Sequence, residues 1–310
     1  MSSNNRHLEP RKKSDLGKKH RELISSAALK PETKRLSRRS FFKGSVGLAA
    51  AALAADTLIL PADAQWRFRE YLPYDAAGDY HYGRYGRIEH HYPEMNPTGE
   101  KFTFVRLKYP GGDWYTNIVN YYYWQSDLQF AKVLAANTTI NVEVREHPQY
   151  VDLDDEGLFA YPFLYMTGHV GIRLSPQQVR KLREYFERGG FLHVEDCDAR
   201  LNNYRGGLRP HIYDMMRQVY PEKNFERLEM SHPIYHTLYK HDEYLGGDKR
   251  IPDVCDYDEA IMDDDRVIAY FSPSDLNCAW EGRPCEPGGE EQREWAFEQG
   301  MNVVAYALTR

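Results

Sequence analysis

The chain has 310 residues, enough for one large domain or two ordinary ones, and its 42% hydrophobic and 14% aromatic content is ample for a packed core. Residues 1–64 hold 13 basic and 6 acidic residues, which leaves 27 basic against 40 acidic residues and a formal charge of −13 for the remainder. Binding to nucleic-acid phosphates depends on clustered Lys and Arg, so this acidic composition excludes nucleic acid as an expected partner.

The N-terminal segment has the pattern of an export signal. Arg38 and Arg39 follow a polar, basic stretch, and a weakly hydrophobic run rich in Ala and Gly leads to Pro-Ala-Asp-Ala at residue 64. This pattern predicts a twin-arginine signal peptide over residues 1–64, cleaved after Ala64, with retention as an uncleaved anchor as the alternative. We therefore expect the twin-arginine translocase as a partner during export and a periplasmic location. After cleavage we expect no stable transmembrane span, because the run carries Asp56 and falls short of roughly 20 apolar residues.

Residues 65–100 are crowded with Tyr, His and Gly and show no sustained period, which predicts an irregular arm. The organised part, residues 101–310, alternates strands with helices. Alternating or continuous apolar runs predict strands over 102–108, 140–144, 161–166, 191–195 and 267–271. Helical periodicity predicts helices over 127–136, from Pro176 to the Gly189-Gly190 pair, over 208–219 and over 290–308. This alternation predicts an α/β fold, a flavodoxin-like open, mostly parallel sheet with helices on both faces.

In such a sheet, ligands bind beyond the carboxyl ends of the strands. Two strands end there in polar residues, and two later loops can reach the same edge; the candidate ligand-binding residues are Thr167, His169, Glu195, Asp196, His232 and Asp275. A histidine beside carboxylates suits acid/base chemistry or a divalent metal held by His169, Asp196 and His232. The alternative is that these side chains only cap neighbouring loops.

The cysteines of the acidic part are Cys197, Cys255, Cys278 and Cys285. An oxidising periplasm permits disulfides, and Cys278 and Cys285 flank a short loop that could close a bridge, although spacing alone does not establish connectivity. Cys197 directly follows a predicted strand, where a nucleophile could lie. Its neighbours Asp196 and Asp198 should raise the pKa of the thiol, which disfavours that role.

A dense aromatic stretch includes Trp114 and Trp124. Exposed rings of this kind stack on sugars, whereas buried ones are core.

Four segments carry a resemblance to a known family: Leu158–His169, Leu182–Phe191, His232–His236 and Ala279–Glu281. The chain from about Lys101 to Arg310 resembles the uncharacterised family called domain of unknown function 4159. The resemblance implies the fold of class I glutamine amidotransferase-like proteins. Amidotransferases of that class need a cysteine at the elbow and a downstream His-x-Glu pair. Neither occurs at a matching position, so we expect no glutamine amidotransferase activity.

The leading hypothesis is thus an exported, non-catalytic protein that binds a ligand such as a glycan, or that assists envelope assembly with another envelope protein. The alternative is a metal-dependent hydrolase that uses the carboxyl edge of the sheet.

Overall fold

The computed structural model describes residues 101–116, 126–145, 149–169, 171–197, 207–248, 256–281 and 284–310, all within one unit, Leu36–Arg310. Several predictions lie outside the described residues: the signal peptide with Arg38 and Arg39, the arm over 65–100, and those on Trp124, Asp198 and Cys255. None of the helices in the described ranges is long and apolar enough to cross a membrane.

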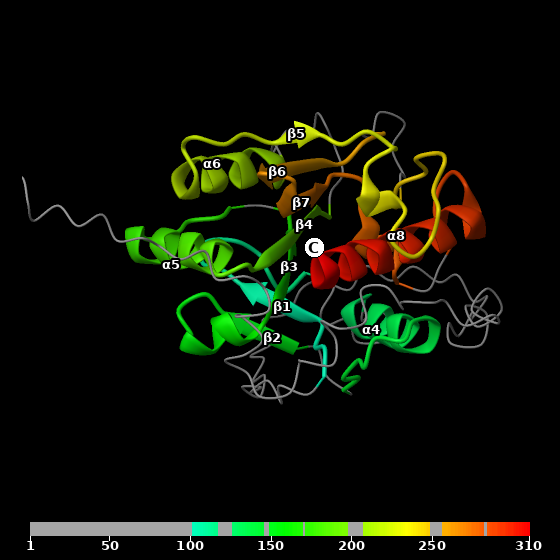
Figure 1. Ribbon diagram of the computed structural model, residues 1–310, viewed down its shortest axis with the longest axis horizontal. Helices are drawn as coiled ribbons and strands as arrows, with labels where there is room; N and C mark the ends of the chain where they lie inside the picture. The colour runs from blue at the N-terminus through cyan, green and yellow to red at the C-terminus, as the bar shows by residue number, and fades with distance from the viewer. Residues whose placement is uncertain are drawn as a thin grey trace, which may run out of the picture. The chain divides into compact units, whose positions relative to one another are not determined.

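The described strands form one seven-stranded sheet in the order β2-β1-β3-β4-β7-β6-β5 (Figure 1). The strands are β1 (Val105–Lys108), β2 (Gln149–Asp152), β3 (Phe163–Gly168), β4 (Phe191–Asp196), β5 (Glu226–Arg227), β6 (Glu259–Asp263) and β7 (Arg266–Ser272). Neighbours from β2 through β7 pair in parallel, while β6 pairs antiparallel with both β7 and β5. The prediction of an open, mostly parallel α/β sheet is confirmed.

Helices cover both faces of this sheet, with α4 and α8 on one side and α5 and α6 on the other (Figure 1). The helices are α4 (Ser126–Asn137), α5 (Pro176–Glu187), α6 (Arg209–Val219), α7 (Leu276–Ala279) and α8 (Gly289–Thr309), with short 3₁₀ turns η2 (Glu156–Ala160) and η3 (Pro233–Tyr235). Each face buries its own apolar cluster, which explains why β3 and β4 are apolar along most of their length.

The best-predicted helix, α5, begins and ends where its sequence signals lie. The Ser175 side chain accepts a hydrogen bond from the Gln178 backbone N–H, and Gln178 Oε1 accepts one from the Ser175 backbone N–H, which makes a capping box with proline at the first turn. Gly189, with φ of +97°, follows the last turn in a conformation that favours glycine.

Two parts of the predicted sheet need correction. Residues 140–144 are not a strand, since only an isolated bridge joins Val142 to Phe102, and the edge strand β2 follows a few residues later. The antiparallel strands β5 and β6 were not predicted from the sequence. Asp264 and Asp265 form the turn between β6 and β7, with Asp264 at φ +53°.

A buried arginine fixes the segment that follows β1. Arg106 pairs with Asp127 of α4, and both side chains are buried. The same guanidinium donates to the Trp114 backbone carbonyl at 3.0 Å and to that of Thr116. Residues 113–116 are therefore held against the carboxyl edge of the sheet.

Candidate functional site

Side chains from four parallel strands lie together at the carboxyl edge. Asp113 follows β1, His169 follows β3, Cys197 follows β4, and Asp275 and Cys278 follow β7. In the sheet, β2 lies on one side of β1 and β3 lies on the other side. The direction in which successive strands are added therefore reverses between β1 and β3. Ligands of open α/β sheets bind at this kind of point.

Asp113 holds His169 by two contacts. Asp113 Oδ2 lies 2.6 Å from His169 Nδ1, and Asp113 Oδ1 accepts the His169 backbone N–H at 2.9 Å. Gly168 permits this approach, because a Cβ there would lie 2.3 Å from the Tyr109 hydroxyl and 2.9 Å from Asp113 Oδ1. The two contacts fix both the position and the ring orientation of His169, whose side chain is 37% exposed.

Cys197 is buried, and His169 is one of the groups that act on the charge of its thiol. A hydrogen bond with Cys278, opposed by burial and assisted by His169, lowers the pKa of the Cys197 thiol to about 5. Burial lowers the pKa of His169, but the hydrogen bonds with Asp113 and Cys197 outweigh it and raise that pKa to about 11. The pair therefore favours a thiolate beside an imidazolium. The expectation that adjacent carboxylates keep Cys197 protonated is wrong.

Part of that error comes from Asp196, because its carboxylate binds the backbone of another element. Asp196 Oδ2 accepts the backbone N–H groups of Leu208 and Arg209, both at 3.2 Å. These groups open helix α6, so the carboxylate has the capping role that was the alternative at the sequence level.

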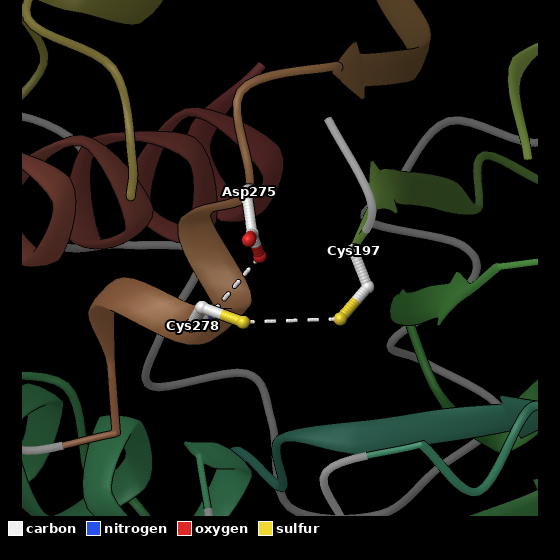
Figure 2. A group of neighbouring side chains, drawn as sticks. All are labelled: Cys197, Asp275 and Cys278. Carbon is white, nitrogen blue, oxygen red and sulfur yellow. Dashed lines mark hydrogen bonds between the residues drawn. The ribbon is translucent and has the colours of Figure 1, made fainter. Parts of the chain in front are cut away.

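The second thiol of the site is Cys278 in α7, whose Sγ lies 3.9 Å from Cys197 Sγ (Figure 2). Its pKa is raised, chiefly by its hydrogen bond with Cys197 and then by burial. The predicted Cys278–Cys285 disulfide is not formed: within the described residues, Cys197, Cys278 and Cys285 are all thiols. Cys285 instead lies in the apolar cluster beneath α8.

Asp275 completes the group drawn in Figure 2. It has a left-handed backbone conformation, with φ of 59°, and its side chain accepts the Cys278 backbone N–H at 3.1 Å. Burial first, and then the charges of Cys197 and Glu195, raise the pKa of its carboxyl group. Ligand atoms of Cys197, Asp275 and Cys278 lie within 4.8 Å of one another, so these are the described residues that could hold a thiophilic cation such as Zn²⁺.

Glu195 and Thr167 lie beneath the thiols as an internal pair. Glu195 is fully buried and accepts hydrogen bonds from the Thr167 hydroxyl and, at 3.3 Å, from the Tyr165 hydroxyl. Burial and the charge of Cys197 raise the pKa of Glu195. The two side chains are thus hydrogen-bonded to each other in the interior next to the site.

His232 does not reach this edge. It accepts the Ile234 backbone N–H as the cap of η3, and its ring lies 5.7 Å from that of Tyr306. The Tyr306 hydroxyl accepts the Val267 N–H near the start of β7, at the opposite end of that strand. His169, Asp196 and His232 therefore do not form the metal site predicted from the sequence.

The aromatic residues of the predicted sugar-binding stretch differ in their exposure. The Trp114 ring is partly buried and lies 5.1 Å from that of Tyr150, whereas Tyr115 is 49% exposed. Whether this surface stacks on a sugar stays a prediction.

Sequence reasoning missed Asp113 and the role of Cys278. Asp113 follows the first strand after a Pro-Gly-Gly turn, so the rule about carboxyl ends could have identified it. No spacing pattern joins Cys278 to Cys197, which lie 81 residues apart.

The fold and site together define an α/β protein with two thiols, a histidine and two carboxylates at the carboxyl ends of neighbouring parallel strands. Residues 103–308 match the family described as "Domain of unknown function (DUF4159)", and the chain belongs to that family. A search of curated proteins gave no match.

Proposed function

We propose that the protein is a thiol-dependent acyl hydrolase in which Cys197 is the nucleophile, His169 the acid/base and Asp113 the group that orients His169. The observation that carries the proposal is the 2.6 Å contact of Asp113 Oδ2 with His169 Nδ1, next to a buried Cys197 thiol whose pKa His169 helps to lower. A nucleophile, a base and a group that orients the base recur in this order on unrelated folds.

The reaction follows from this order. The Cys197 thiolate attacks the acyl carbon of an ester or amide, and the His169 imidazolium protonates the departing alcohol or amine. His169 then takes a proton from water, the resulting hydroxide attacks the thioester, and the acid leaves while Cys197 returns to the thiolate. Asp113 stabilises the imidazolium in each half of the cycle and takes up no proton.

Part of the strand order, β2-β1-β3-β4-β7, supports a flavodoxin-like sheet of the amidotransferase-like kind. His169 precedes Cys197 in the chain, unlike the downstream His-x-Glu pair of amidotransferases, so glutamine is not the proposed substrate. We also propose that the protein is exported through its twin-arginine segment and acts in the periplasm; the Arg38-Arg39 pattern supports this part.

The test uses the full chain exported from a bacterial host and a panel of acyl esters and amides. We expect turnover that Cys197→Ala abolishes and that His169→Asn lowers about 100-fold, in the range of general acid/base effects. Cys285→Ala, which removes another buried thiol, is the matched control and should keep full turnover. Activity that survives Cys197→Ala would overturn the proposal.

Two rival functions give different results in the same experiment. A non-catalytic glycan-binding protein would show no turnover but would change its tryptophan fluorescence on binding a glycan. A metal-dependent hydrolase would contain a stoichiometric metal by elemental analysis and lose activity to a chelator. The contact of Asp113 with His169, beside a Cys197 thiol of lowered pKa, favours the thiol mechanism over both.

A further inference from the structure

We infer that Cys197 and Cys278 form a reversible disulfide that inactivates the site. The inference deepens the proposed function, since it assigns regulation to the same nucleophile, and it rests on that function for its consequence. The disulfide itself is a separate, directly measurable event.

The geometry supports a pair rather than two separate thiols. The two sulfur atoms lie 3.9 Å apart and face one another across the gap between the ends of β4 and β7 (Figure 2). A disulfide bond is about 2.05 Å long, so the sulfurs must approach by about 2 Å.

The two cysteines are also placed as an attacking and a resolving thiol. Cys197 follows β4 beside His169, and Cys278 of α7 brings its sulfur within 3.9 Å of the Cys197 sulfur. A second thiol at this distance can attack an oxidised Cys197 sulfur before further oxidation, which is the arrangement of redox-sensitive cysteines.

The oxidant class is a hydroperoxide, which is small enough for a buried thiolate. The Cys197 thiolate attacks one peroxide oxygen, the O–O bond breaks, and hydroxide or alkoxide leaves, so that Cys197 becomes a sulfenic acid. The Cys278 sulfur then attacks the Cys197 sulfur, the S–O bond breaks, and the proton of Cys278 leaves with the hydroxyl group as water. The two thiols lose two electrons, which reduce the peroxide.

The test treats the reduced full chain with hydrogen peroxide near neutral pH and measures the intact mass and the peptide map. We expect the mass of two hydrogens to be lost, a Cys197–Cys278 cross-linked peptide, and full reversal by dithiothreitol. Cys285→Ala should behave like the parent. Cys278→Ala should form no cross-link and should instead gain oxygen at Cys197.

Several outcomes separate this inference from the proposed hydrolase. A cross-link without any ester or amide turnover would overturn the hydrolase and its regulation, but leave the disulfide standing. Turnover that persists in peroxide-treated protein, or a cross-link that uses Cys255 or Cys285 in place of Cys278, would overturn the inference and leave the hydrolase intact.

Discussion

Arg106 of β1 and Asp127 of α4 form an ion pair whose side chains are 0% and 3% exposed, with Arg106 Nε donating to Asp127 Oδ2 at 2.9 Å. The pair joins the sheet to a helix of one face, and the remaining Arg106 donors fix the carbonyls of residues 114 and 116. It thereby links the stability of the fold to the position of Asp113.

Arg106→Met should lower the free energy of unfolding by about 3–5 kcal/mol, because it leaves Asp127 as a buried charge without its cation. The double variant with Asp127→Leu should recover part of the loss. Lys108→Met is the matched control, since its ion pair with Asp152 on the same sheet is 41% and 38% exposed and contributes less than about 1 kcal/mol. Urea unfolding measures all three, and equal losses for Arg106→Met and Lys108→Met would contradict the expectation.

Alkylation of Cys197 by iodoacetamide should stay fast from neutral pH down to about pH 5 and slow below it, because the pKa of this thiol is lowered to about 5. In Asp113→Asn the loss of the carboxylate weakens the imidazolium, and the midpoint should move upward toward the ordinary thiol range. Peptide mapping of the labelled site against pH gives both curves. Identical midpoints would show that Asp113 does not act on the thiol through His169.

Gly168→Ala should lower the alkylation rate of Cys197 at neutral pH at least about tenfold, because the new Cβ meets the Tyr109 hydroxyl and Asp113 Oδ1. Tyr109→Phe in the same background removes the nearer clash and should restore part of the rate. Thermal unfolding of each variant separates a local shift of Asp113 from a general loss of structure. An unchanged rate would indicate that Asp113 tolerates displacement.

Asp196→Ala should lower the free energy of unfolding by about 1–2 kcal/mol through loss of the acceptor for the first N–H groups of α6. Asp196→Asn keeps an acceptor oxygen and should cost less. The rate at which Asp196→Asn hydrolyses the acyl substrates should stay within about twofold of the parent rate, since the carboxylate faces α6. A complete loss of turnover in Asp196→Asn would show that Asp196 takes part in the reaction.

His193→Leu should raise the free energy of unfolding and reduce its dependence on pH. Neither ring nitrogen of His193 has a hydrogen-bond partner within the described residues, and burial lowers its pKa from 6.5 to about 3. A lowered histidine pKa means that the unfolded chain binds the proton first, so stability is fully present above pH 6.5 and falls as the pH drops toward 3. Denaturant unfolding at pH 7 and pH 4.5 should show a smaller difference for the variant; an equal difference would contradict the assignment.

Local patterns were sufficient for most of the fold. The capping box at Ser175, the apolar runs of β3 and β4 and the alternation of strands with helices each depend on neighbours in sequence, and the structure has them near the predicted bounds. The edge strands β2 and β5, and β6, which pairs antiparallel with β5, could not be predicted, because short strands are defined by their partners more than by their own residues.

For the site, the sequence by itself determined that polar residues lie at the carboxyl edge of the sheet, since the strand ends at His169, Glu195 and Asp275 can be recognised from local sequence patterns. Only the tertiary structure decided which side chains meet there. It directed Asp196 to the α6 backbone, placed His232 at the far end of β7 and set Cys278 against Cys197. The reason is physical: the charge on a thiol depends on the groups that surround it in space, and residues far apart in the chain supply those groups.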